Sequence, residues 1–342
     1  MHELEIFDVS PYVYTGTAAI EQQYYGLPVG GIKLLLADIT LAFGRGNSVV
    51  LAFDSKTNKK ELYPSYKSNR TPNRAVLIQL QFLLEHLQYA GLHCYKFDNV
   101  EADDIVDWAI FQNVLNYQGV VIHGNDHDLL HSLTENAIYK PIRKSENIIS
   151  TSSFSLLADK DREIPYNLIS ADKVFFGCKS DCIRPFKSAS GISNKQLFDA
   201  YVQLLTDHEL IDDYWETVSK NNLLYFIENS ELFTDSDRSE LRVRVDLVFP
   251  LDCPEGVQII PNVVKDLNKD AYGNLLTMVK DMGGIRTLRL RFQEIQGIFL
   301  ESIKEYASRY KTGSVSVDSN LEVEPSYEIE ALPVDAFMGK HF

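Results

Sequence analysis

The sequence predicts an α/β fold, in which a mostly parallel, twisted sheet is flanked by helices and followed by a mainly helical region. Short apolar runs alternate with longer amphipathic stretches along residues 1–164, a pattern typical of strands and helices that build a parallel sheet. Two of the apolar runs end in an aspartate, at Asp8 and Asp54. From residue 165 onward, helical stretches and polar turns replace the strand pattern.

Each predicted element follows from its own residues. Apolar runs rich in β-branched and aromatic residues predict strands, at 4–9, 48–54, 92–96 and 119–123. Apolar residues at helical spacing predict helices, at 30–39, at 75–89 and from about residue 101. In the second region the next strand-like run is 243–249.

Length and composition exclude several classes of protein. A chain of 342 residues with 45% hydrophobic residues can bury the core of one large domain or two ordinary ones. It contains no apolar run of the roughly 20 residues needed to cross a bilayer, and residues 1–5 lack the pattern of a signal peptide. We therefore expect a cytoplasmic protein with no membrane partner. The four cysteines form no CxxC pair, which predicts free thiols.

The net charge of −15 argues at first sight against a nucleic-acid partner, because binding a polyanion usually needs a basic surface. Residues 55–74, however, combine one acid, Glu61, with six basic residues. These are Lys56, Lys59, Lys60, Lys67, Arg70 and Arg74. Taken alone, such a run is a solvated basic face. A phosphate-binding surface is the other interpretation, and the motifs around the run favour it.

Acidic residues recur where the predicted strands end. In parallel sheets the carboxyl ends of the strands meet at one edge, so acids placed there should converge. Two acids end strands, three share one turn of the helix that starts near residue 101, and two follow the strand that ends at residue 123. The set is Asp8, Asp54, Glu101, Asp103, Asp104, Asp126 and Asp128.

Seven carboxylates gathered in one place would repel one another strongly without cations. Hard oxygen ligands suit Mg²⁺ or Mn²⁺, and two such ions about 4 Å apart can activate water in phosphodiester hydrolysis. For any single acid, the other interpretation is a helix N-cap or first-turn residue. That interpretation suffices for Glu101 or Asp126 but does not explain why acids recur at successive strand ends.

In chain order, these residues resemble motifs of the 5′-nuclease superfamily, which includes flap endonucleases, the 5′-nuclease domain of bacterial DNA polymerase I and bacteriophage exonucleases. The matching segments lie within about residues 4–195. They are Gly26-Leu27-Pro28-Val29-Gly30-Gly31-Ile32, Phe53-Asp54 with Tyr63-Pro64-Ser65-Tyr66-Lys67-Ser68-Asn69-Arg70, Glu101-Ala102-Asp103-Asp104, and Gly124-Asn125-Asp126-His127-Asp128-Leu129. In the last segment Asn125 intervenes in the family's G-D-K-D-L pattern. The resemblance implies a PIN-like 5′-nuclease core and a metal-dependent 5′-3′ exonuclease, flap endonuclease or both, acting in replication or recombination.

The resemblance also implies roles for particular residues. The seven acids and Asp181 match the site of two divalent ions. Lys67 and Arg70 match catalytic residues of the family's helical gateway, here about residues 56–90, which contact the scissile phosphate. Tyr66 either stacks on a base or packs as an internal aromatic. The full set of expected DNA contacts is Lys56, Lys60, Tyr66, Lys67, Arg70, Arg74, Gly191, Ser193 and Lys195.

Residues 165–311 resemble, near their start, the family's helix–three-turn–helix element, which grips duplex phosphates and often holds K⁺ through backbone carbonyls. The family's G-D-x-x-D-N-I reads Gly177-Cys178-Lys179-Ser180-Asp181-Cys182-Ile183 here, and its G-I-G-x-K reads Gly191-Ile192-Ser193-Asn194-Lys195. Cys178 thus stands where the family has an acid. Because a thiol is a poor Mg²⁺ ligand, either the second ion binds weakly or Cys178 is a silent packing residue.

Residues 312–342 carry six acids without helical or strand periodicity, which predicts a flexible acidic tail that docks a replication protein. The expected substrates are DNA with 5′ ends, flaps or branches, and RNA–DNA hybrids. The lack of an attached polymerase favours a stand-alone, phage-like nuclease in the host cytoplasm. Two alternatives stay open. One is a PIN-like ribonuclease, which normally lacks the gateway, and the other is a branched-DNA-binding protein with an impaired active site.

Overall fold

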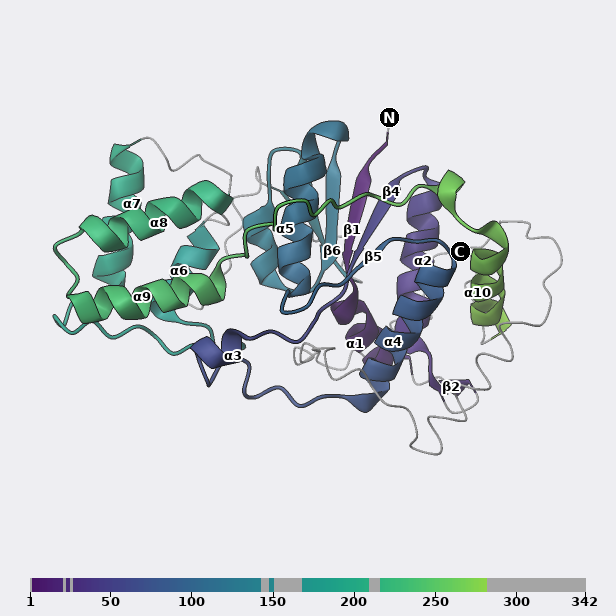
Figure 1. The fold of residues 1–342 in the computed structure, drawn as a ribbon, viewed down its shortest axis with the longest axis horizontal. Helices are drawn as coiled ribbons and strands as arrows, with labels where there is room; N and C mark the ends of the chain where they lie inside the picture. Colours follow the sequence, from purple (N-terminus) through teal and green to yellow (C-terminus); the bar gives the residue numbers. More distant parts are fainter. Residues whose placement is uncertain are drawn as a thin grey trace.

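The computed structural model describes residues 2–20, 23–24, 27–142, 148–150, 168–208 and 216–281, and Figure 1 shows its ribbon. A six-stranded sheet with strand order β5-β4-β1-β6-β7-β8 lies at its centre. Neighbouring strands are parallel, except that β7 and β8 are antiparallel. The strands are β1 Leu4–Asp8, β4 Ser48–Ala52, β5 Cys94–Tyr95, β6 Val120–Gly124, β7 Ala137–Pro141 and β8 Ile149–Ser150. The predicted α/β class with a mostly parallel sheet is confirmed.

Helices cover both faces of the sheet. Because side chains alternate along a strand, Phe7 and Leu51 pack into one apolar core while Ile6 and Val50 pack into another. The first core also contains residues of three helices, α1 Val9–Ala19, α2 Gly30–Gly44 and α4 Arg74–Tyr89. The second contains residues of α5 Ala102–Asn113. Short elements join these parts: β2 Gln23–Tyr24, β3 Leu27–Pro28, α3 Lys59–Leu62, η1 Val114–Asn116 and η2 His127–Ser132.

Glycines allow α1 and α2 to approach closely. A Cβ atom on Gly31 would lie 2.5 Å from Cα of Val13, and one on Gly16 would lie 2.4 Å from the carbonyl oxygen of Gly30. The backbone N–H of Gly31 also donates to Oε1 of Gln79 in α4 at 2.9 Å. The glycines of the first motif therefore serve the packing that supports β1, from which Asp8 projects.

A separate helical region with its own apolar core lies beside the sheet (Figure 1). Its helices are α6 Ile169–Phe176, α7 Asn194–Asp207, α8 Glu216–Asn229 and α9 Asp235–Val248. The prediction of a strand at 243–249 is therefore wrong, because residues 243–248 belong to α9. Thr234 caps α9 through the backbone N–H of Asp237, and the helical spacing of Leu241 and Val245 buries both side chains in the region's core.

The chain returns to the sheet after α9. Residues 249–263 run along α5, where Leu251 and Ile259 exchange hydrogen bonds with α5 side chains, and they pair with β4 through Val49 and Asn262. After η4 Val264–Asp266, helix α10 Lys269–Asp281 packs against α2 and α4. The segment predicted as one helical unit, 165–311, thus divides, because the apolar face of α10 is buried in the first core.

Two predictions fall on other parts of the chain. The predicted start of the helical region at Pro165 lies outside the described residues, and so does the predicted acidic tail at 312–342. Among the helices that the structure describes, none is both long and apolar enough to traverse a bilayer.

Candidate metal centre

The predicted acids gather at one edge of the sheet. Asp8 is the last residue of β1, Asp54 follows β4 by two residues and Asp126 follows β6 by two. Because β1 pairs in parallel with both neighbours, these three positions lie at the same end of adjacent strands. A Cβ atom on Gly124, the last residue of β6, would lie 3.7 Å from Cβ of Asp8. The sheet therefore brings together acids that are far apart in sequence.

The start of α5 adds three more carboxylates. One oxygen each from Glu101, Asp103 and Asp104 lies within 4.8 Å of the others. The backbone N–H of Ala102 donates to Oδ1 of Asp54 at 2.8 Å, which ties the acid after β4 to the same helix start. The positive end of the helix dipole favours negative charge at this position.

Each of the three acids at the start of α5 has different contacts. Both oxygens of Asp104 accept backbone hydrogen bonds, from Glu101 at 3.0 Å and from Leu251 at 2.8 Å. Asp103 is half-buried, whereas Glu101 and Asp104 are buried. Asp103 is therefore the most accessible of the three.

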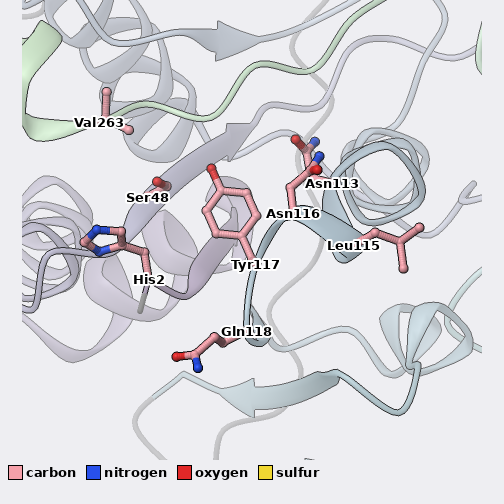
Figure 2. Close-up of a pocket in the computed structure, with 8 residues that line it drawn as sticks. All are labelled: His2, Ser48, Asn113, Leu115, Asn116, Tyr117, Gln118 and Val263. Atoms are coloured by element: carbon pink, nitrogen blue, oxygen red, sulfur yellow. The ribbon is translucent and has the colours of Figure 1, made fainter.

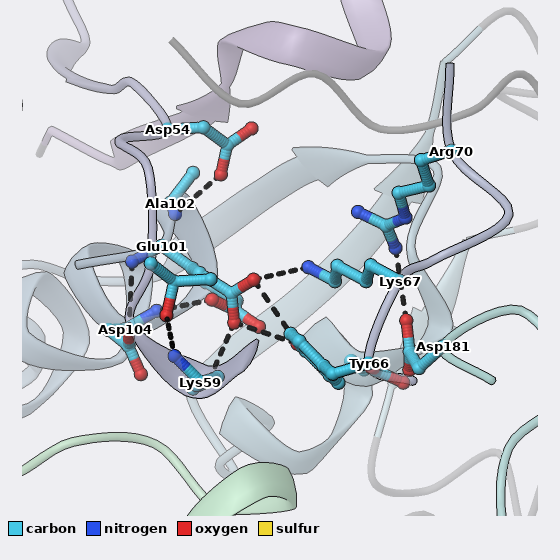
Figure 3. Close-up of polar contacts among 12 residues, drawn as sticks. Asp54, Lys59, Tyr66, Lys67, Arg70, Glu101, Ala102, Asp104 and Asp181 are labelled. Carbon is cyan, nitrogen blue, oxygen red and sulfur yellow. Dashed lines mark hydrogen bonds and ion pairs between the residues drawn. The ribbon is translucent and has the colours of Figure 1, made fainter. Parts of the chain in front are cut away.

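Glu101 is surrounded by the gateway segment, as Figure 3 shows. Its oxygens pair with Nζ of Lys59 at 2.6 Å and with Nζ of Lys67, and the Tyr66 hydroxyl donates to Oε2 at 3.0 Å. The predicted base-stacking role of Tyr66 is wrong in this structure, because its ring is only 4% exposed and its hydroxyl is committed to Glu101. The packed-aromatic interpretation holds instead.

A second group of charges links the loop after β6 to the helical region. Asp181 accepts from Nη2 of Arg70 at 3.0 Å and from Nζ of Lys173 at 3.3 Å, and Lys173 also pairs with Asp128. Asp126 caps η2 by accepting from the backbone N–H of Asp128 at 2.9 Å. The structure thus places Arg70 of the gateway segment and Asp181 of the helical region together.

Sequence reasoning missed two buried or half-buried lysines. The sequence places Lys59 in the basic run without indicating that it is buried, and no motif includes Lys173. Lys173 lies in α6, directly before the apolar residues Val174, Phe175 and Phe176. Its place beside this apolar run is the one feature of the sequence that could have indicated a half-buried lysine. Both lysines bind predicted metal-site acids.

Burial and crowding change the acidity of this site. Burial raises the pKa of Asp54 to about 6 and that of Asp104 to about 7. Burial and the neighbouring Asp126 raise the pKa of Asp128 to about 7. For Asp181, burial is outweighed by Lys173, Lys67 and Arg70, which lower its pKa to about 2. Carboxylates with raised pKa values gain most from an added cation, which favours their charged form.

The donor set fits a hard divalent cation. The ligand atoms offered by Glu101, Asp103 and Asp104 are carboxylate oxygens, which Mg²⁺ and Mn²⁺ prefer. Oδ2 of Asp54 is buried and has no hydrogen-bond partner in the described part of the chain. A buried carboxylate oxygen without a donor is costly unless a cation or proton satisfies it.

Cys178 lies at the turn after α6. Its backbone exchanges hydrogen bonds with Ile183 at 2.8 Å in both directions, and its Sγ atom lies 2.9 Å from Oγ of Ser180. Burial raises the pKa of the Cys178 thiol to about 11, so the sulfur is protonated at neutral pH. A protonated thiol does not replace the carboxylate that the family motif has at this position.

The remaining predicted DNA contacts lie on the surface. Lys56, Lys60 and Arg74 are exposed around the gateway. At the second site all three predicted residues are exposed: Gly191, with φ +77°, Ser193, which caps α7, and Lys195, which pairs with Asp199 at 2.5 Å.

A cavity of about 530 Å³ lies elsewhere, at the amino ends of the strands (Figure 2). Ser48 begins β4 and Gln118 precedes β6, so the cavity faces the edge of the sheet opposite Asp8. It is lined by His2, Ser48, Asn113, Leu115, Asn116, Tyr117, Gln118 and Val263, none of them acidic. The predicted metal-site acids therefore lie at the opposite edge from this cavity.

Comparisons with known proteins identify a family and several relatives to which this chain is similar. The family model for the 5′-3′ exonuclease N-terminal resolvase-like domain matches residues 4–182. A 5′-3′ exonuclease of Buchnera aphidicola subsp. Acyrthosiphon pisum is 30% identical over 155 residues, which cover 43% of this chain and 54% of that protein. The chain therefore spans about half the length of that relative. DNA polymerase I of Caldicellulosiruptor bescii is 23% identical over 246 residues, 71% of this chain and 28% of the polymerase. The structure of the bacteriophage T5 D15 flap endonuclease aligns with a TM-score of 0.49 and 14% identity over 90% of this chain and 100% of that chain.

Proposed function

The chain belongs to the 5′-3′ exonuclease family by its N-terminal resolvase-like domain, and on this premise we propose that it is a divalent-metal-dependent nuclease that hydrolyses DNA at 5′ ends, flaps or branches. The observation that carries the proposal is the convergence of acids from β1, β4, α5 and the loop after β6 beside two gateway cations. A ribonuclease of the PIN type is less favoured, because residues 63–70 carry the gateway motif and a helical region with its own core is present.

The acids that would hold Mg²⁺ or Mn²⁺ are Asp8, Asp54, Asp103 and Asp126, with Asp128 beside them. Glu101, Asp104 and Asp181, also predicted as ligands, are engaged in this structure by Lys59, by backbone N–H groups and by Arg70, respectively. When bound, a pair of such ions activates water and stabilises the leaving oxygen of a phosphodiester. The protein supplies an oxygen-rich site at the positive end of α5, where burial of Asp54 favours cation binding over solvation of the free carboxylate.

Lys67 and Arg70 would bind the scissile phosphate. Lys67 lies between Glu101 and Asp181: its Nζ pairs with Glu101, and its backbone N–H donates to the carbonyl of Asp181 at 2.9 Å (Figure 3). Arg70 pairs with the Asp181 carboxylate on the other side. Cations held in this way, in a partly dehydrated site, stabilise charge that develops on the phosphate. The exposed Gly191, Ser193 and Lys195 would grip the duplex, with K⁺ held at this turn.

The test uses a labelled 5′-flap DNA and the variants Asp103→Ala and Asp126→Ala. Each should abolish cleavage in Mg²⁺ or Mn²⁺, while binding in Ca²⁺ survives, because phosphate contacts elsewhere remain. Glu135→Ala is the matched control, since Glu135 is exposed and precedes β7 at the opposite edge of the sheet. Near-wild-type turnover by either aspartate variant would contradict the metal-dependent mechanism. If the wild type cleaved only RNA, a PIN-like ribonuclease would replace the proposal. If it bound flap DNA without cleaving it, a branched-DNA-binding protein with an impaired active site would.

A further inference from the structure

The contacts of Glu101 are unusual because two lysines share a single buried carboxylate. Lys59 approaches Oε2 and Lys67 approaches Oε1, while Tyr66 bonds to both oxygens at 3.0 and 3.2 Å. The side chains of Lys59, Lys67 and Glu101 are exposed by 6%, 7% and 3%. One ammonium group would suffice to form an ion pair with Glu101, yet this carboxylate has two ammonium partners.

The two lysines are held in different ways. Lys59 is fixed near the start of α3, where its backbone N–H donates to Oγ1 of the buried Thr57 at 3.1 Å. Lys67 stands in a loop with φ +47°, a left-handed conformation that non-glycine residues rarely adopt. Both ammonium groups lie near the Tyr66 ring, at 5.9 Å for Lys59 and 5.2 Å for Lys67.

Lys59 is the first residue of α3, and its buried ammonium group pairs with Oε2 of Glu101 at 2.6 Å. Lys67 lies closer to the predicted phosphate path, because Arg70 and Asp181 stand on its other side. Lys59 is therefore the stationary partner of Glu101, and Lys67 is the partner available to a substrate.

We propose that Lys59 is a positioning residue, which keeps Glu101 neutralised when Lys67 turns from Glu101 to a DNA phosphate. Removing the only partner of a buried charge is strongly unfavourable. Without Lys59, Lys67 would be that only ammonium partner and would stay on Glu101. With Lys59 in place, Lys67 can transfer to the phosphate while Glu101 keeps one ion pair and the Tyr66 hydrogen bonds. This inference rests on the proposed function, since it requires a phosphate as the second partner of Lys67.

The experiment measures binding of a fluorescent 5′-flap DNA in Ca²⁺ over a series of KCl concentrations, so that no turnover is needed. Each protein cation that binds a phosphate adds about 0.7 to 0.9 to the slope of log affinity against log salt. Lys59→Met should lower this slope by about 0.7 to 0.9, the amount expected for the loss of one phosphate contact. This loss is expected even though the buried Lys59 side chain does not itself bind a phosphate. Lys59→Arg, which keeps the charge, should retain the wild-type slope.

Repeating the Lys59→Met change in two other variants tests whether Lys59 acts through Lys67 and Glu101. In Lys67→Met the slope is already reduced, and adding Lys59→Met should change it no further. In Glu101→Gln the ion pair between Lys67 and residue 101 is lost, so adding Lys59→Met should again have no effect. Lys60→Met is the matched control: Lys60 is the exposed neighbour on α3, and as a direct phosphate contact it should reduce the slope equally in every background.

Cleavage rates at saturating DNA provide a second readout. Lys59→Met should lower kcat in Mg²⁺, and Lys59→Arg should restore kcat to the wild-type value. If Lys59→Met alone fails to fold, the Lys59→Met/Glu101→Gln protein, which lacks the uncompensated buried charge, is compared with Glu101→Gln. Equal salt slopes for the double variant and for Glu101→Gln support the proposal, and unequal slopes overturn it. Additive losses from Lys59→Met and Lys67→Met would also overturn it, and leave the proposed function intact. A wild-type protein that neither binds nor cleaves flap DNA would overturn both.

Discussion

Glu5, the second residue of β1, provides a quantitative test of a buried charge in the sheet that carries the acidic edge. Its oxygens lie 2.9 Å from Nε2 of His123, 2.6 Å from Nη2 of Arg45 and 2.7 Å from Nδ2 of Asn47, and its side chain is 2% exposed. Burial alone would raise the pKa of Glu5, but these three partners more than offset burial and lower it from 4.5 to about 2. The change Glu5→Gln keeps the shape of this side chain and removes its charge.

The expected size follows from proton linkage. Each tenfold change in proton affinity corresponds to about 1.36 kcal/mol, so a pKa lowered from 4.5 to about 2 contributes about 3 kcal/mol to the free energy of unfolding. Because the pKa is lower in the folded state, this contribution is present above pH 4.5 and disappears as the pH falls toward 2. Glu5→Gln should therefore be less stable than the wild type by about 3 kcal/mol at pH 7, and by less than half of that at about pH 3.

The assay is urea-induced unfolding, followed by tryptophan fluorescence at several pH values between 7 and 3. Glu3→Gln is the control, because Glu3 is exposed and accepts one hydrogen bond from Asn47 at 3.1 Å. It should change the free energy of unfolding by no more than about 0.5 kcal/mol. A stability gap for Glu5→Gln that stays constant over this pH range would refute the reasoning, since the loss would then come from packing and not from charge.

Two other predictions concern packing and metal affinity. Gly31→Ala should lower the free energy of unfolding by about 1–3 kcal/mol, because its Cβ would lie 2.5 Å from Cα of Val13; Gly44→Ala, with no atom within 4 Å of its Cβ, should be neutral or slightly stabilising. Urea unfolding measures both, and equal effects would show that the α1–α2 contact can adjust. Cys178→Asp should lower the Mg²⁺ concentration for half-maximal cleavage, and Asp181→Ala should raise it or abolish activity. An unchanged midpoint in a folded Cys178→Asp protein would identify Cys178 as a packing residue only.

The acidic edge was predictable from the sequence because it depends on short-range patterns and one general rule. The apolar runs that end at Asp8 and precede Asp54 are strands, and parallel pairing brings their carboxyl ends together. The three acids at the start of α5 needed only the helical repeat. None of these inferences required knowledge of which distant side chains meet.

The partners of these acids could not be predicted in the same way. Helix α3 is four residues long, too short for periodicity to show that Lys59 points inward while Lys60 is exposed. Lys173 meets Asp128 across 45 residues of sequence. The run 243–249 misled for a related reason: its apolar residues alternate with Arg244 and Asp246 as in a strand, yet Arg244 is buried in α9 and donates to the carbonyl of Arg184 at 2.6 Å.

The three acids at the start of α5 illustrate how tertiary contacts divide one motif into separate functions. Glu101 turns to Lys59, 42 residues earlier in the chain. Asp104 turns to the backbone of Leu251, 147 residues later, where the chain leaves the helical region. Asp103 is left half-buried between them. Glu101 and Asp104 form a capping box at the start of α5, and the gateway and the returning segment fix them further. Asp103 is thereby left as the most accessible of the three carboxylates for the proposed metal.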